Sequence, residues 1–176
     1  MSSETVLYQL TETSKFMMSF VIVTKEDNVI VIDGGRAEDM PLLKEYVAGR
    51  HISAWILTHA HGDHIGGFVS EMKRNGGADF DIGCVYYNFP PYNELMEKTD
   101  VPDLNYFRAE LSGILPDFLE IEPMLEGRAH IARQGDGWQK RVSNPLLPMA
   151  SHYRRESWLA VPAIPLPWWT PATCMP

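Results

Sequence analysis

The feature that most constrains how this chain folds is an apolar segment that runs directly into a cluster of ionisable side chains. Residues 53–58 (Ser-Ala-Trp-Ile-Leu-Thr) have the composition of a buried strand. Four potential metal ligands follow within six positions: His59, His61, Asp63 and His64. Neutral imidazole is the commonest nitrogen ligand for zinc, and a carboxylate can take a further position. The pattern therefore predicts a metal site at the end of a buried strand, in preference to a solvated polar turn.

The four ligands divide into two pairs. In a tight loop, His59 and His61 can point to one side of the backbone and share one ion. Asp63 and His64, at the start of the following helix, can turn toward a second ion, or Asp63 can instead hold the attacking water. Glycine at position 62 allows the backbone to pass close to the metals.

The apolar pattern over the rest of the chain predicts a mixed sheet flanked by helices. We expect strands over residues 5–10, 16–23, 29–32, 53–58 and 85–87, with a hairpin turn at 26–28. We expect helices over residues 41–47, 64–74, 92–97 and 104–115. Hairpin strands followed by strands that alternate with helices are typical of an α/β domain.

Two motifs resemble those of the metallo-β-lactamase-fold hydrolases. The first is His-x-His-x-Asp-His at 59–64 followed by Gly66-Gly67, and the second is Val-Ile-Asp-Gly-Gly at 31–35. The resemblance covers roughly residues 5–139. It implies an αββα sandwich of two mixed sheets, with metals at one edge between them, of which this chain holds the first half and an incomplete second half.

The same resemblance implies roles for individual residues. His59 and His61 would bind a first zinc ion, and Asp63 and His64 a second, with Asp63 also serving catalysis. Asp33 would brace the metal loop from behind the ligands. The implied activity is zinc-dependent hydrolysis, in which a metal-bound hydroxide attacks an ester, phosphodiester or related bond of a small-molecule or other ester-type substrate.

The second half of the chain departs from the family pattern. After His64 the sequence contains only two more histidines, His130 and His152, as candidates for the remaining ligands. The bridging aspartate would have to be replaced by Asp136 or Glu156. An incomplete site predicts low hydrolytic activity, and the alternative is a non-catalytic metal-binding or protein-interaction module derived from the same fold.

The composition of the chain changes abruptly near Gln139. Residues 1–139 hold all 13 glycines and 22 of the 23 acidic residues, whereas residues 140–176 hold seven of the 13 prolines and three of the five tryptophans. We therefore divide the chain into a domain at 1–139 and an atypical tail at 140–176. A tail translated in a shifted reading frame would have this composition, and the competing explanation is a genuine proline-rich interaction tail.

Charge and hydropathy limit the partners. The formal net charge of -8 disfavours a broad contact with nucleic acid or with an anionic membrane. No apolar run is long enough to span a bilayer, and no secretory signal is evident. Two cysteines suggest free thiols in a reducing compartment, so we expect a cytoplasmic protein. Apolar residues in 16–23 and 29–32 would stay uncovered by an incomplete second sheet, which predicts self-association.

Overall fold

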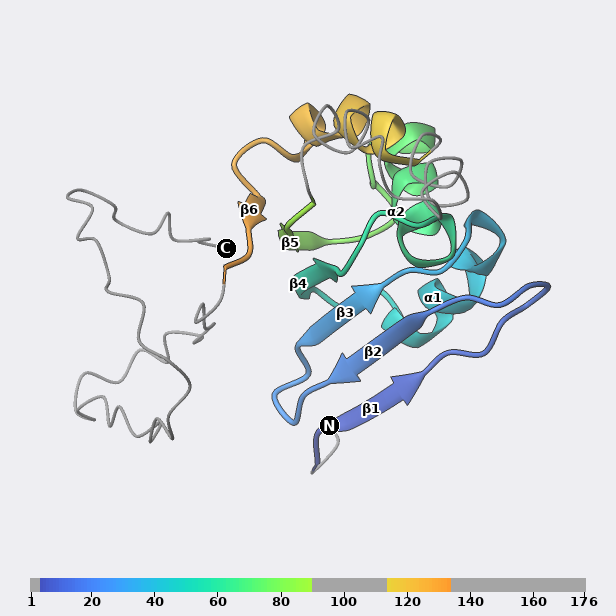
Figure 1. Cartoon of the computed structure of the whole chain (residues 1–176). Coiled ribbons are helices and arrows are strands. Elements are labelled where there is room, and N and C mark those ends of the chain that lie inside the picture. Colours follow the sequence, from blue (N-terminus) through green and yellow to red (C-terminus); the bar gives the residue numbers. More distant parts are fainter. Residues whose placement is uncertain (1–3, 90–113, 134–176) are drawn as a thin grey trace, which may run out of the picture.

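The computed structural model describes residues 4–89 and 114–133. Over these ranges the chain forms a six-stranded mixed sheet with the strands in sequential order, as Figure 1 shows. The strands are β1 (Val6–Gln9), β2 (Ser19–Val23), β3 (Val29–Asp33), β4 (Ile52–Leu57), β5 (Ile82–Tyr87) and β6 (Ala129–Ile131). β1, β2 and β3 pair antiparallel, and β3 to β6 pair parallel. The predicted mixed sheet is confirmed.

The helices begin and end close to the positions that the sequence predicts. A short 3-10 helix η1 (Ala37–Asp39) leads into α1 (Met40–Val47), which has proline in its first turn. α2 (Gly62–Asn75) starts two residues before the predicted helix and ends where Gly76 adopts a left-handed conformation. Residues 114–121 are helical and continue into the 3-10 helix η2 (Glu122–Leu125). The helix expected over 92–97, and most of that expected over 104–115, lie outside the described residues.

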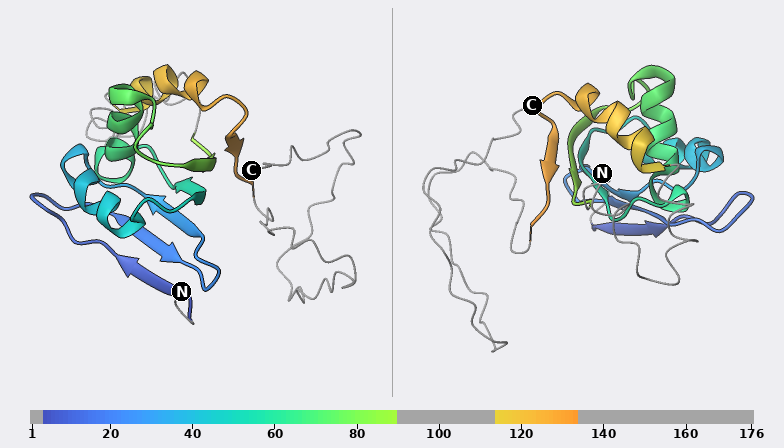
Figure 2. Two further views of the ribbon diagram at one scale, coloured as in Figure 1. Left: turned by 180° about the vertical axis from the view of Figure 1, so that it is seen from behind. Right: turned by 45° about the horizontal axis from the view of Figure 1, so that its top comes forward.

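The helices lie on one face of the sheet, and the hydrophobic core forms between them and the strands (Figures 1 and 2). Side chains alternate in direction along a strand, so every second residue of the central strands points into this core. Trp55 of β4 is fully buried and contacts Phe68 of α2 with ring centroids 4.9 Å apart. The side chains that form the core are supplied by β2 to β5, α1, α2 and residues 114–125.

The opposite face of the sheet is also apolar, but it is only partly covered. In the strand register, Phe20, Ile32, Ile56 and Tyr86 lie side by side across β2 to β5. All four are partly exposed, and none belongs to the buried core. The described residues thus supply one sheet with its helices, consistent with part of a metallo-β-lactamase-like sandwich.

Two further findings concern the cysteines and the length of the helices. Cys84 is buried in β5. The second cysteine, Cys174, lies outside the described residues. Within the described ranges, no helix is long and apolar enough to cross a membrane.

Candidate metal centre

The predicted ligands lie at the carboxyl end of β4, where the chain turns sharply into α2. The amide N–H of His61 donates to the carbonyl of His59 at 3.0 Å, and the amide of Ile65 donates back to the carbonyl of His61 at 2.9 Å. His61 is the extended residue that precedes the helix. His59 and His61 therefore come from the loop, whereas Asp63 and His64 come from the first turn of α2.

The structure brings these side chains together. The ring centroid of His59 lies 4.6 Å from that of His61 and 3.7 Å from that of His64. The centroids of His61 and His64 are 6.4 Å apart. Asp63 Oδ2 lies 3.9 Å from His64 Nε2. Three imidazoles and one carboxylate thus share a small, partly exposed region at one edge of the sheet.

Asp33 fastens this loop from the end of the neighbouring strand. β3 and β4 run parallel, so their carboxyl ends meet at the same edge of the sheet. The buried Asp33 carboxylate accepts hydrogen bonds from the Thr58 amide at 2.8 Å and the Thr58 hydroxyl at 2.7 Å. Its Oδ2 also lies 2.8 Å from His64 Nδ1. A hydrogen bond at one ring nitrogen fixes the orientation of an imidazole and leaves the other nitrogen for a metal.

The environment favours neutral imidazole at the centre of the cluster. Burial, followed by the neighbouring His64 and His61, lowers the pKa of His59. Neutral imidazole is the form that ligates metal ions.

Backbone contacts fix the position of α2 against two other segments. The Met18 amide donates to the carbonyl of Asp63 at 2.9 Å, and the Gly34 amide donates to the carbonyl of His64 at 2.7 Å. A Cβ at Gly67 would lie only 2.6 Å from the Gly34 carbonyl oxygen, so glycine is required there. The sequence analysis missed the roles of Thr58 and Met18, because both depend on how separate segments pack.

The donors fit a metal ion in chemistry and in location. In the described part of the chain, however, no group of three or more His, Cys, Asp or Glu side chains is arranged to hold an ion. The rings of His59 and His64 are packed against each other, with an angle of 53° between their planes.

The candidates from the second half of the chain do not complete the cluster. His130 lies in β6, as predicted for a strand histidine, and its ring stacks on Tyr86 with centroids 5.2 Å apart. Asp136, His152 and Glu156 lie outside the described residues.

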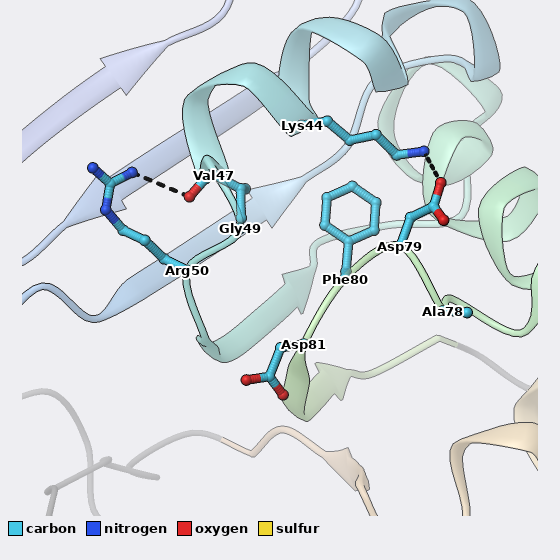
Figure 3. Close-up of a pocket in the computed structure, with 8 residues that line it drawn as sticks. All are labelled: Lys44, Val47, Gly49, Arg50, Ala78, Asp79, Phe80 and Asp81. Carbon is cyan, nitrogen blue, oxygen red and sulfur yellow. Dashed lines mark hydrogen bonds and ion pairs between the residues drawn. The ribbon is translucent and has the colours of Figure 1, made fainter.

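One pocket in the described part of the chain lies away from this cluster. Its volume is about 400 Å³, and Arg50 and Asp81, which line it, come just before the amino ends of β4 and β5. Figure 3 shows Lys44 reaching across it to Asp79, and Arg50 donating to the carbonyl of Val47. Since these charged groups already bond to protein partners, the pocket adds no donor to the metal centre.

Comparison with known proteins agrees with the motifs. No curated protein matches the chain significantly. Residues 17–77 match the family model described as the metallo-beta-lactamase superfamily, over a segment that contains Asp33 and all four predicted ligands. The resemblance inferred from the sequence is thereby confirmed. The similarity to the metallo-beta-lactamase superfamily thus covers residues 17–77, which include β2 to α2.

Proposed function

We propose that this protein is a zinc-dependent hydrolase acting on an ester, phosphodiester or related bond. The observation that carries the proposal is the gathering of three imidazoles and one carboxylate at the carboxyl end of β4, with His64 oriented by the buried Asp33. His59 and His61 would hold one ion, and Asp63 and His64 a second.

The zinc ion, Asp33 and Asp63 would have distinct roles in the proposed hydrolysis. When bound, zinc supplies Lewis acidity and a nucleophile at neutral pH. Asp33 occupies Nδ1 of His64, so that Nε2 stays available for a ligand. Asp63, partly exposed beside His64, would orient a water molecule and accept its proton.

The second candidate is a non-catalytic metal-binding or protein-interaction module of the same fold. It is favoured by two observations: the described residues contain no group of three or more His, Cys, Asp or Glu side chains arranged to hold an ion, and one face of the sheet is apolar and partly exposed. Hydrolysis separates the two candidates. Turnover of bis(4-nitrophenyl) phosphate, a thioester, a lactone or nitrocefin by the zinc-loaded protein, abolished by Asp63→Ala, supports the enzyme; no turnover of any of them supports the module.

Zinc binding tests the metal site, which the hydrolase and a metal-binding module have in common. We expect zinc to remain after gentle dialysis, measured by elemental analysis, and to disappear in the double variant His59→Ala, His61→Ala. Affinity should fall well below the roughly 10 to 16 kcal/mol of complete structural zinc sites, because the ligand set is incomplete.

The matched control is His51→Ala. This histidine lies outside the loop, where Nδ1 is 2.9 Å from Asp81 Oδ2, and its removal should leave the zinc content unchanged. Zinc at background in the unmodified protein, or equal zinc in the double variant, would contradict the proposed site.

A further inference from the structure

The exposed ring of Phe16 and the partly exposed guanidinium of Arg36 form a pair on segments that adjoin the first turn of α2. Phe16 is 67% exposed. The Arg36 Cζ lies 5.1 Å from the centroid of its ring, and Arg36 Nε donates to the Phe16 carbonyl at 3.2 Å. The ring and the backbone of one residue thus hold the guanidinium of the other in place.

Within the described residues, most hydrogen-bond donors of this guanidinium have no acceptor. An arginine has five N–H donors, and one of those of Arg36 is used by Phe16. The nearby acidic side chains are engaged elsewhere: Asp39 accepts the Thr13 hydroxyl and the backbone amide of Arg36, and Glu38 accepts the Ser14 hydroxyl. Among the described residues, no carboxylate forms an ion pair with the guanidinium of Arg36.

Four other cations in the described part of the chain differ in this respect. Lys44, Arg50, Lys73 and Arg74 are each ion-paired with an acidic side chain. In a chain with a net charge of -8, an arginine without such a partner is an available site for an external anion.

The pair is fixed to the segment that carries the metal ligands. Met18, two residues after Phe16, donates to the carbonyl of Asp63, and the carbonyl of Gly35 accepts from the amide of Gly67 in α2. A Cβ at Gly66 would lie 3.8 Å from the Cα of Arg36. Met18 is itself 39% exposed. The first turn of α2, which carries Asp63 and His64, therefore packs directly against both segments that supply the pair.

We propose that Arg36 and Phe16 form a recognition site for an oxyanion attached to an apolar group. The guanidinium would bind a carboxylate or phosphate through its open donors, and the ring of Phe16, with Met18, would contact the apolar part. As a substrate site it rests on the proposed hydrolase function. It narrows the substrate class to esters that carry a negatively charged group beside an apolar one.

Binding of small probes tests the site without hydrolysis. Benzoate and phenyl phosphate carry an oxyanion on a ring, and benzamide is the neutral counterpart of benzoate. Titrations are performed with EDTA present, so that no probe binds through metal, and are followed by NMR of the Arg36 Nε–H and the amides of residues 16–18. We expect at least one of the two anions to bind about tenfold more tightly than benzamide, and their comparison tells carboxylate from phosphate recognition.

Variants test whether Arg36 and Phe16 are the residues that bind the probes. Arg36→Gln should remove the preference for the anion, and Arg36→Lys should restore part of it, since lysine keeps the charge without the planar fork. Phe16→Ala should weaken benzoate and benzamide alike. Lys25→Gln removes one charge in the turn between β2 and β3, where Lys25 lies 3.7 Å from Glu26, and this variant should bind the probes as the unmodified protein does.

Equal affinity for benzoate, phenyl phosphate and benzamide would overturn the inference. So would an Arg36→Gln variant that still prefers the anions over benzamide, or NMR shifts that are confined to residues other than Arg36 and 16–18. These results are independent of the zinc measurement. If the protein binds zinc but does not prefer the anionic probes, only the recognition site is contradicted. If it prefers the anionic probes but binds no zinc, Arg36 still forms an anion site, but that site has no role in a hydrolase.

Discussion

At the scale of single residues, Asp33 links the sheet to the metal loop. Its carboxylate is 1% exposed and accepts from Thr58 and His64, and its backbone φ is 57°. Asp33→Ala should lower the free energy of unfolding by about 3 kcal/mol, because it leaves buried donors without an acceptor and places alanine in a left-handed conformation. Asp33→Asn should cost less, since its amide oxygen can still accept from the Thr58 amide. Chemical denaturation measures both.

Asp81→Ala is the matched control for Asp33. The Asp81 side chain is 69% exposed and contacts His51, so its loss should change the free energy of unfolding by no more than about 0.5 kcal/mol. Equal losses for Asp33→Ala and Asp81→Ala would contradict the bracing role.

The sequence singled out His59, His61, Asp63, His64 and Asp33 because each lies in a short local motif, and the structure shows that they lie near one another. Their role in metal binding stays a prediction. The sequence could not identify Thr58, Met18 or Arg36 as their neighbours. The contacts of these three residues join segments that are far apart in the chain, and they depend on the pairing of β3 with β4 and on the packing of α2. Local pattern carries little information about such contacts.

At the scale of elements, the apolar periodicity predicted the strands and helices well where turn-forming residues mark the boundaries. The hairpin at 26–28 and the end of α2 at Gly76 are examples. β5 starts at Ile82, three residues before the predicted strand, because Gly83 and Cys84 are poor strand signals whose place is fixed by pairing with β4. The helix over 114–121 extends past the predicted end at 115 because Leu115, Phe118 and Ile121 pack into the core.

Ion pairs between α1, α2 and the segment before β5 predict a dependence of stability on acid. Hydrogen bonds from Lys44 and Arg74 lower the pKa of Asp79 from 3.8 to about 2. A carboxyl whose pKa is lower in the folded protein stabilises it above the unfolded pKa, and this contribution is lost as the pH falls through the folded pKa. Stability should therefore decline between about pH 4 and pH 2, and Asp79→Asn should make that decline shallower.

Urea denaturation at pH 5, 3.5 and 2.5 measures the effect of Asp79→Asn. Asp27→Asn serves as a control, since Asp27 also pairs with an arginine, Arg50, but at the turn between β2 and β3. A decline of the same slope in the Asp79→Asn variant and in the unmodified protein would show that Asp79 is not responsible.

At the scale of the whole molecule, the division at Gln139 remains a prediction, because residues 134–176 lie outside the described part. The shifted-frame hypothesis is tested on the source DNA. An alternative frame downstream of codon 139 that encodes glycine-rich, acidic strands supports it, and the absence of such a frame contradicts it.

The apolar face of the sheet predicts that the protein associates with a second copy of itself. Phe20, Ile32, Ile56 and Tyr86 form a continuous row opposite the helices, and all are partly exposed. Burial of about 600 Å² of apolar surface contributes on the order of 15 kcal/mol before the cost of ordering the chains. Because a stable interface usually buries about 1,200 to 2,000 Å² in total, two such faces packed together are sufficient for association at micromolar concentration.

Light scattering measures this association, and two variants locate it. Ile32→Lys places a charge in the middle of the row without entering the core, so it should shift the protein toward monomer. Leu119→Lys changes a 46% exposed leucine of the helix over 114–121, on the other side of the sheet, and should leave association unchanged. Hydrogen exchange over residues 140–176 tests the alternative, in which that segment covers the apolar face. A monomer in which that segment exchanges slowly would mean that the chain covers the face itself, and both self-association and the shifted-frame origin of the tail would then be wrong.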